Sequence, residues 1–343
     1  MIDSKRTLTP SSWINPAISP PQQSVDVEWR TDPLTGEVGM LPGLRAVKME
    51  EPDFKTLAAK SLERPCPFCP ENIDRAASNF PPEFIPEGRI RIGGCTLFPN
   101  IVPYVPDSAV AVFSPKHFER HADFAEADLV NGLKACREYL SRLAGYHPDS
   151  KYQFIGMNYL PMACASILHP HIQVYASETP LPRHARLLAG SESYYNDCGR
   201  NYWADYVSEE KERGERCIGT VGGTEWFASF VSLGWMMDLT AVFPGRKTLS
   251  ELADGDLNDF ARGLKRVFRY MAGQNYYSYN LALYSGLPDS RSFWCHARLV
   301  QRVQYGPLGQ SDMSTFQLLM GGYTMLKRPE ETAGEIRPYL AAP

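Results

Sequence analysis

Three polar side chains recur at alternate positions of the segment SILHPHIQVYAS, residues 166–177: His169, His171 and Gln173. A β-strand points successive side chains to opposite faces, so residues at i, i+2 and i+4 share one face. The Ile, Leu, Val and Tyr residues around them favour a strand. We therefore expect two imidazoles and a carboxamide to meet on one face, which could be part of a core, a metal site or a reaction centre.

A metal site is indicated by Cys66 and Cys69 in the segment CPFC, because a spacing of two residues lets both thiolates reach one tetrahedral ion. Two further ligands would be needed. His117 and His169 are the candidates, and His121, expected at an exposed helix start, is the competing one. A Cys2His2 set fills the coordination sphere, so the ion would be a structural zinc. The alternative is a pair of buried thiols in a Pro-rich turn.

A metal on His169 would leave His171 available for chemistry on the same face of the strand. A neutral imidazole is a competent nucleophile towards phosphorus and can leave again afterwards. Such a nucleophile needs hydrogen-bond donors for the charge on the phosphoryl oxygens, and Gln173, Ser166 and Asn158 could supply them. The alternative is that His171 is a partly buried histidine with a structural hydrogen bond.

The composition narrows the classes of protein. The chain has 343 residues, enough for two domains or one unit built twice, and a net charge of -4. This charge provides no basic field for nucleic acid. We find no signal-peptide pattern and no apolar run near the ~20 residues of a membrane helix, so we expect no membrane partner. The eight cysteines indicate reduced thiols or ligands, and we expect a cytoplasmic protein.

Two segments, residues 109–146 and 238–273, share the order strand, turn and helix, and a strand-like run and a closing strand follow each. This order repeats after roughly 130 residues. Each helix carries an apolar stripe at 3- and 4-residue spacing: Leu129, Leu133, Cys136, Leu140 and Leu143 in the first, and Leu257, Phe260, Leu264, Val267 and Met271 in the second. We expect an α+β chain of four parts: an irregular arm at 1–45, two related halves at 46–190 and 221–343, and a helical connector at 191–220.

The motif HPHIQ, residues 169–173, resembles the His-Pro-His-x-Gln motif of the galactose-1-phosphate uridylyltransferase branch of the histidine-triad superfamily. Other segments resemble that family in the same order along the chain. They are DPLTGEVGMLPGLRAVKM (32–49), CPFCPEN (66–72), TLFPN (96–100), VFSPKH (112–117), EWFASFVSLGWMMDLTAVFPGR (225–246) and LMGGYTML (319–326). The resemblance spans residues 30 to about 330, and several motifs in register are more specific than any one of them.

The resemblance implies a histidine-triad type of fold, with two tandem half-barrel sheets of mostly antiparallel strands and packed helices, and a homodimer. It implies zinc ligands at Cys66, Cys69, His117 and His169, a nucleotidylated histidine at His171, and a hydrogen bond from Gln173 to the phosphoryl oxygens. It also implies phosphate contacts at Asn158, Ser166, Arg45 and Lys48, nucleoside contacts at Phe98 and Asn100, and a substrate contact at Tyr323.

The second half departs from the family's pattern. A metal site present there in some members is incomplete, because Arg298 occupies one histidine position and His296 is left. We therefore predict no metal in this half and a structural role for His296. In the expected sugar pocket, Leu318 stands where the family has lysine and Glu330 where it has glutamine. The lost cation and the gained carboxylate predict an acceptor other than plain galactose 1-phosphate.

The resemblance implies a nucleotidylyltransferase. It would move a nucleoside monophosphate, expected to be UMP, from a nucleotide-sugar to a sugar 1-phosphate or related acceptor through a nucleotidyl-histidine. Two alternatives stay open: a nucleotide-sugar phosphorylase that uses inorganic phosphate, and a retired enzyme that only binds nucleotides or a protein partner. A nucleic-acid-binding zinc knuckle is disfavoured, because one Cys-x-x-Cys pair in an acidic chain supplies no positive stripe.

Overall fold

The computed structural model describes residues 2–43, 47–306 and 308–342. Within these residues the largest feature is one continuous sheet of ten strands, whose neighbours are all antiparallel. In spatial order the strands are β4 (Ile90–Ile92), β5 (Cys95–Pro99), β6 (Asp107–Val112), β8 (His171–Ser177), β7 (Tyr152–Tyr159), β12 (Ser278–Tyr284), β13 (His296–Arg302), β11 (Asp238–Val242), β10 (Thr224–Ala228) and β9 (Cys217–Val221).

The order of the strands is the same in both halves of this sheet. From one edge inwards it is β4, β5, β6, β8, β7, and from the other edge it is β9, β10, β11, β13, β12. The two series meet where β7 pairs with β12, with Gly156 opposite Ala282. The predicted α+β class with mostly antiparallel strands is confirmed. The two half-sheets share one ladder at the centre, because the edge of each supplies the backbone partners of the other. The boundaries of the four parts stay a prediction.

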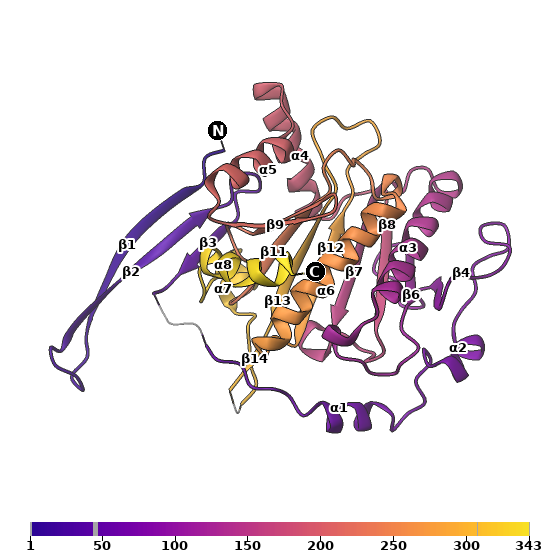
Figure 1. Ribbon diagram of the computed structural model, residues 1–343, viewed down its shortest axis with the longest axis horizontal. Helices are drawn as coiled ribbons and strands as arrows, with labels where there is room; N and C mark the ends of the chain where they lie inside the picture. Colours follow the sequence, from indigo (N-terminus) through magenta and orange to yellow (C-terminus); the bar gives the residue numbers. More distant parts are fainter. Residues whose placement is uncertain (1, 44–46, 307, 343) are drawn as a thin grey trace.

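Helices α3 (Glu126–Tyr146) and α6 (Asp254–Gly273) pack against each other and cover one face of the sheet (Figure 1). Every residue of the two predicted apolar stripes is buried. The main core lies between these helices and the sheet, as where Trp226 of β10 stacks on Phe260 of α6 with ring centroids 5.6 Å apart. Because strand side chains alternate, every second residue of each strand points to the opposite face, which these helices leave uncovered.

The N-terminal segment forms a hairpin, so the irregular arm that its composition predicts is wrong. Strands β1 (Lys5–Ile14) and β2 (Gln22–Thr31) pair over ten residues each and extend away from the body in Figure 1. Every residue of β1 is exposed. Because neither face of the strand is buried, its sequence does not need the alternation of apolar and polar residues that identifies a half-buried strand. Pro10 is tolerated because β1 is an edge strand. The hairpin joins β3 (Val38–Leu41) and β16 (Gly322–Thr324) in a second sheet.

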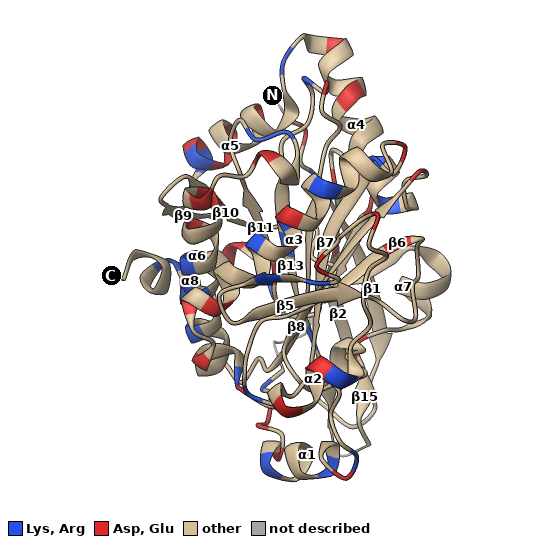
Figure 2. Cartoon of the chain, turned by 90° about the vertical axis from the view of Figure 1, so that its right-hand side faces the viewer, with Lys and Arg blue, Asp and Glu red and all other residues tan. Residues whose placement is uncertain are grey.

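The segment between the halves is helical, as α4 (Pro182–Cys198) and α5 (Tyr202–Arg213). The remaining elements are α1 (Phe54–Ser61), α2 (Pro70–Ala76), α7 (Thr315–Met320), α8 (Pro329–Ala341), the short strands β14 (Gln304–Tyr305) and β15 (Gln310–Ser311), and three 3-10 turns, η1 (His121–Asp123), η2 (Pro161–Ala163) and η3 (Leu249–Glu251). Figure 2 shows acidic and basic residues mixed along α5, α6 and α8. Among the described residues, no helix is both long and apolar enough to cross a membrane.

Candidate active site

Cys66, Cys69, His117 and His169 lie together, with one ligand atom of each within 4.8 Å of the others. His169 Nδ1 is 3.9 Å from Cys66 Sγ and 3.7 Å from Cys69 Sγ, and His117 Nδ1 is 3.4 Å from Cys69 Sγ. Around a tetrahedral ion, bonds of about 2.3 Å to sulfur and about 2.0 Å to nitrogen place these two kinds of ligand about 3.5 Å apart. The donor atoms are therefore spaced as the corners of one tetrahedral metal site.

Hydrogen bonds on the outer side of both histidines fix their orientation. His169 Nε2 donates to the carbonyl oxygen of Ser114 at 2.7 Å, so Nδ1 keeps its lone pair towards the cysteines. His117 Nε2 lies 2.7 Å from Ser61 Oγ, which itself donates to the Ala58 carbonyl oxygen at 2.7 Å. The Ser61 oxygen must therefore accept from His117. Histidines that bind metals commonly make such outer hydrogen bonds.

Burial sets the protonation of these four residues. It lowers the pKa of His169 to about 4 and also lowers the pKa of His117, so both are neutral imidazoles near pH 7. Burial, together with the neighbouring Cys66, raises the pKa of Cys69 to about 12. Two adjacent buried thiolates need a cation between them, and a coordinated thiol loses its proton. The site therefore offers the mixed sulfur and nitrogen set that a borderline-soft divalent ion prefers.

His121, the competing ligand, lies outside this cluster. It is buried in η1, and its ring contacts those of Phe268 and Tyr159 at centroid distances of 5.2 and 5.7 Å. The prediction of an exposed helix start at His121 is therefore wrong, since the turn before α3 packs beneath aromatic side chains of both halves.

His171 begins β8, directly beyond the cluster of Cys66, Cys69, His117 and His169. Its Nδ1 lies 2.7 Å from the carbonyl oxygen of His169 and must donate, because a carbonyl oxygen can only accept. Nε2 therefore carries the lone pair, and it has no hydrogen-bond partner in the part of the chain that the structure describes. The residue is only 9% exposed, and this burial lowers the pKa of His171. The result is a neutral imidazole with a fixed tautomer.

The segment of Cys66 and Cys69 also supports the ring of His171. Phe68, between the two cysteines, meets His171 edge to face with centroids 5.3 Å apart, and it meets Phe98 in the same way at 5.5 Å. Phe98 in turn packs with Val110 and Val112 of β6, which pair with Gln173 and His171. A metal that holds the two cysteines would thus also hold the aromatic ring against which His171 packs.

Strand pairing places the predicted polar residues in rows across the face opposite α3 and α6. The central row contains Phe98, Val110, Gln173, Gly156, Ala282 and Arg298. Two positions along the strands in one direction, the same face carries His171, Asn158 and Asn280; in the other direction it carries Tyr175, Phe154 and Tyr284. His171 and Gln173 of β8 and Asn158 of β7 therefore border one another on one face.

A chain of hydrogen bonds from the second half orients the Asn158 amide. Asn280 Nδ2 donates to Asn158 Oδ1 at 2.7 Å, Arg302 Nη1 donates to Asn280 Oδ1 at 2.8 Å, and Arg302 Nη2 pairs with Asp312 at 2.8 Å. The Asn158 NH2 group and the Gln173 carboxamide have no hydrogen-bond partner among the described residues. Both therefore have donors to offer to a ligand.

A cavity of about 520 Å³ lies over the middle of these rows. Its lining is mostly apolar and aromatic, with a few amide and guanidinium groups. The lining residues are Tyr104, Val105, Phe154, Gly156, Asn158, Gln173, Tyr175, Leu181, Leu233, Asn280, Leu281, Ala282, Tyr284, Arg298, Val300, Arg302, Met313 and Tyr323. A concave, largely apolar pocket with a few converging polar groups is typical of a small-molecule site.

The remaining predicted contacts are distributed around this centre. Tyr323 of β16 lines the cavity. Asn100 follows β5, where its Oδ1 accepts the backbone N–H of Val102 at 3.0 Å. Ser166, in the loop before β8, and Lys48, after β3, are both exposed and do not line the cavity. Arg45 lies outside the described residues.

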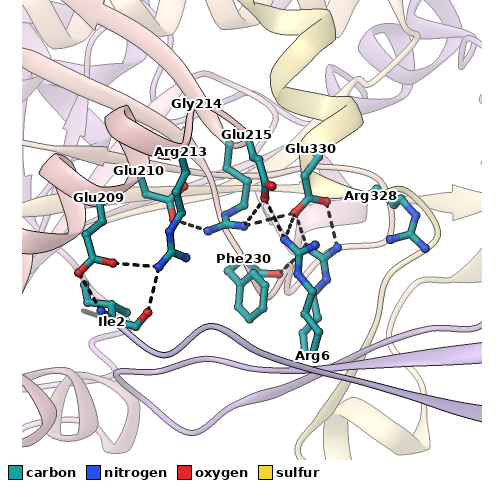
Figure 3. Close-up of polar contacts among 12 residues, drawn as sticks. Ile2, Arg6, Glu209, Glu210, Arg213, Gly214, Glu215, Phe230, Arg328 and Glu330 are labelled. Atoms are coloured by element: carbon teal, nitrogen blue, oxygen red, sulfur yellow. Dashed lines mark hydrogen bonds and ion pairs between the residues drawn. The ribbon is translucent and has the colours of Figure 1, made fainter.

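Neither Leu318 nor Glu330 lines the cavity. The predicted place of Glu330 in a sugar pocket is wrong, because arginines hold its carboxylate elsewhere, whereas that of Leu318 stays a prediction. Leu318, on α7, is 68% exposed. Glu330, at the start of α8, makes a two-pronged ion pair with Arg30, with both N–O distances 2.9 Å. Figure 3 shows its further contact with Arg6, at 2.9 Å. The substitution of glutamine by a carboxylate is explained by these arginines and not by a ligand.

Three arginines surround one aromatic ring beside Glu330. The guanidinium carbons of Arg216, Arg30 and Arg6 lie 4.8, 5.0 and 5.5 Å from the centroid of Phe230. Burial acts to raise the pKa of Glu330, but its hydrogen bonds and charge interactions, chiefly with Arg30, lower it to about 2. The cluster therefore fastens the N-terminal hairpin to α8 through a partly buried carboxylate.

The corresponding positions of the second half contain His296 and Arg298. His296 is buried and stacks on Trp203 of α5 with ring centroids 3.8 Å apart. Arg298 Nε lies 2.9 and 3.0 Å from the two carboxylate oxygens of Asp238. Among the described residues, the one cluster of metal-ligating type is that of Cys66 and its partners.

Solved structures share this fold. The galactose-1-phosphate uridylyltransferase-like protein of Arabidopsis thaliana has a TM-score of 0.70 at 18% identity, covering 90% of this chain and 98% of that one. An ADP-glucose phosphorylase of the same plant, with bound ADP-glucose, has a TM-score of 0.69 at 17% identity, covering 91% and 98%. A uridylyltransferase has a TM-score of 0.66 at 22% identity, covering 91% and 98%. The chain therefore has the fold of these uridylyltransferase-like proteins, which is the fold that the motifs predicted.

No family model matches the chain. An uncharacterized protein of Archaeoglobus fulgidus is 30% identical over 313 residues, which cover 91% of this chain and 92% of that protein. The chain belongs to one family with this archaeal protein.

Some residues of the centre were not found from the sequence. Asn280 and Arg302, which orient Asn158, and Phe154 and Tyr284, which line the cavity, come from β7, β12 and β13. A signal was available in the period-two pattern of these strands, since Asn280, Ala282 and Tyr284 share a face. The pairing of β7 with β12, which brings the two halves together, cannot be inferred from the sequence of either strand alone.

Proposed function

We propose that the protein is a nucleotidyl-transfer enzyme that works by double displacement through His171. The observation that carries this proposal is the state of that imidazole: Nδ1–H is held by the His169 carbonyl oxygen, while the unprotonated Nε2 has no hydrogen-bond partner among the described residues and lies on the same face as Gln173. A neutral, oriented imidazole beside a small-molecule cavity is suited to attack on phosphorus.

In the first step, Nε2 attacks the α-phosphorus of a nucleotide-sugar. The bond from this phosphorus to the bridging oxygen breaks, the sugar 1-phosphate leaves with that oxygen, and a nucleotidyl-histidine forms. The imidazolium charge that develops is stabilised by the hydrogen bond from Nδ1–H to the His169 carbonyl oxygen. In the second step an acceptor phosphate oxygen attacks the same phosphorus, and Nε2 leaves. We expect UMP as the transferred group.

Gln173 and Asn158 would stabilise this chemistry by donating hydrogen bonds to the phosphoryl oxygens, with Ser166, Arg45 and Lys48 as further contacts. The carboxamide donors of Gln173 and Asn158 have no hydrogen-bond partner among the described residues, and the Asn158 amide is held in place through Asn280 and Arg302. Donors that are oriented before the reaction contribute most in phosphoryl transfer. Phe98 and Asn100 would contact the nucleoside, and Tyr323 the sugar end.

Zinc would occupy the cluster of Cys66, Cys69, His117 and His169 as a structural ion. It supplies no chemistry in this proposal beyond bracing the segment that carries Phe68 against β8. All four ligand positions come from the protein, which leaves no open coordination position for a substrate.

The proposal is tested by isotope exchange. Labelled sugar 1-phosphate and the matching nucleotide-sugar, without any second acceptor, should exchange label only if a nucleotidyl-enzyme forms. We expect exchange in the wild type and in the surface variant His147→Ala, and none in His171→Ala. Transfer to an acceptor without this partial exchange would contradict the covalent mechanism.

The fold similarity to an ADP-glucose phosphorylase favours a second candidate, a nucleotide-sugar phosphorylase. The first step would be the same, and inorganic phosphate would then attack the nucleotidyl-histidine to release a nucleoside diphosphate. Product analysis with and without inorganic phosphate separates the two, because the transferase forms no nucleoside diphosphate.

We also propose a homodimer. Two exposed apolar surfaces support it: Leu8, Trp13, Ile14 and Trp29 of the hairpin, and Phe316, Leu318, Leu319 and Met320 of α7. Exposed apolar patches of this kind mark protein interfaces. In sedimentation experiments Leu319→Glu with Met320→Glu should shift the protein towards monomer, while Ile101→Glu, an exposed apolar position outside both surfaces, should not. A wild-type monomer would contradict the proposal.

A further inference from the structure

The cavity forms a groove that crosses the centre of the sheet. Its floor is made by Gly156 and Ala282, the small residues where the two halves meet. Along one side lie the rings of Phe154 and Tyr175, stacked with centroids 4.6 Å apart, and the ring of Tyr284. Along the other side lie the amides of Asn158 and Asn280. A sugar ring suits such walls, because aromatic rings accept its C–H face and amides bond its hydroxyl groups.

Arg298 stands at the far end of this groove from Gln173. Its Nε and Nη2 atoms are held by Asp238, with an Nη2 distance of 2.8 Å, and Nη2 also donates to the Val231 carbonyl oxygen at 2.5 Å. Nη1 has no hydrogen-bond partner within the described residues. The residue is 9% exposed and lines the cavity. An arginine anchored along one edge in this way presents its remaining donors at a fixed position.

The separation of the two ends limits what can occupy the groove. Gln173 and Arg298 are three strand spacings apart, or about 14 Å at about 4.8 Å per strand. A diphosphate and a hexose ring, laid across Gly156 and Ala282, can bridge this span from the phosphorus beside Gln173. The outer substituent of the ring would then meet the guanidinium edge of Arg298.

We infer that Arg298 is an anion subsite, and that the sugar 1-phosphate handled by this enzyme carries a second negative group, a carboxylate or a phosphate, at the end of the ring distant from the anomeric phosphate. This inference rests on the proposed function. The Nη1 donors of Arg298 have no partner among the described residues, and a carboxylate or phosphate would give them a charge-assisted hydrogen bond that a sugar hydroxyl group does not.

The experiment measures formation of the nucleotidyl-enzyme from three kinds of donor with the same base. They are a neutral donor (UDP-glucose), a carboxylate donor (UDP-glucuronate), and a nucleoside phosphorimidazolide, whose leaving group is too small to reach Arg298. Glucose 1-phosphate and glucose 1,6-bisphosphate are compared as acceptors in the second step. The same panel is run with ADP-based donors, so that the choice of base does not limit the result.

The wild type should prefer either UDP-glucuronate to UDP-glucose or glucose 1,6-bisphosphate to glucose 1-phosphate, by about tenfold or more in kcat/KM. A hydrogen bond between charged groups commonly contributes this much. The double variant Arg298→Gln with Asp238→Asn removes the charge without leaving an unpaired buried carboxylate, and it should lower the preference to about one. A preference in the carboxylate pair identifies a sugar acid, and one in the phosphate pair identifies a sugar bisphosphate.

Each other outcome overturns the inference. Equal rates of the wild type with neutral and anionic substrates mean that Arg298 does not select for a charged group. A preference that survives in the double variant, with thermal melting confirming that it is folded, assigns the selectivity to another residue. If the imidazolide labels the enzyme but the wild type shows no preference between neutral and anionic substrates, the subsite alone is overturned. If no donor labels the enzyme, the proposed function is overturned as well.

Ala282→Leu, which fills the floor of the groove and keeps the ion pair of Arg298 with Asp238, should slow the reaction with the sugar donors relative to the imidazolide.

Discussion

His171 and His296 occupy matching places in the two halves of the sheet. Each begins the strand next to the central pair, and each has its Nδ1 near the carbonyl oxygen of the residue two positions earlier, at 2.7 Å from His169 and 3.2 Å from Trp294. Their surroundings differ. His171 lies beside the Cys66 cluster and on the same face as Gln173, which lines the cavity, whereas Trp203 covers His296 at 3.8 Å.

The difference teaches that the strand position alone does not make a reactive histidine. Burial lowers the pKa of His296 to about 3, so both imidazoles are neutral near pH 7. What separates them is access and the next residue on the same face: Gln173 beside His171, and Arg298, paired with Asp238, beside His296. We infer that the first half carries the reaction and the second half carries support and substrate selection.

The largest expected effect is the loss of nucleotidyl transfer when His171 is replaced, compared with replacement of His296. His171→Ala should lower nucleotidyl transfer by at least about a thousandfold, because it removes the only atom proposed to bond phosphorus. His296→Phe should keep transfer within a few-fold, since an aromatic ring can still stack on Trp203. Steady-state kinetics of both variants checks this. Equal losses in the two would remove the functional distinction between the halves.

Removal of the metal ligands should have the next largest effect. Cys69→Ser should lower bound zinc from about one equivalent per chain to a small fraction and should lower the melting temperature, because a structural metal contributes directly to folding. Cys295→Ala, a buried thiol of the second half, should leave the zinc content unchanged. Metal analysis together with thermal melting decides the matter, and full zinc occupancy in Cys69→Ser would contradict the assignment.

Glu330 should govern stability and not catalysis. Glu330→Gln removes the two-pronged ion pair of the fully buried Arg30, which keeps only Glu28 as a charged partner, and such a loss costs about 3 kcal/mol. The Glu330 pKa is about 2 in the folded state against 4.5 ordinarily, so its contribution is fully present above pH 4.5 and is lost as the pH falls towards 2. Denaturant unfolding should show a smaller loss of stability over this range for Glu330→Gln than for the wild type. An equal loss would contradict the role assigned to this carboxylate.

The smallest expected effect is at the residue beside the nucleophile. Gln173→Ala should lower kcat by about tenfold to a hundredfold with little change in KM, because its hydrogen bond to the phosphoryl oxygens is needed most in the transition state. Gln173→Asn, which keeps the amide and shortens its reach, should recover part of the loss. A change confined to KM would indicate simple substrate binding.

The sequence predicted what local spacing determines. The stripes of α3 and α6, the strand at His171 and the meeting of Cys66 and Cys69 with two histidines all follow from periods of 2 and 3.6 residues or from motifs in register. The partner of Glu330 could not be predicted, because Arg30 lies 300 positions away and meets it only through tertiary packing. His121 was misread for a similar reason, since Phe268, which covers it, belongs to the other half.

The measurement that tests the central claim most directly is intact mass spectrometry after brief incubation with UDP-, ADP-, GDP- and CDP-sugars and no acceptor. The mechanism predicts an acid-labile adduct of one nucleoside monophosphate in the wild type and in His296→Phe, absent in His171→Ala. The same adduct in His171→Ala, or acceptor-dependent transfer with no adduct from any donor, would contradict it.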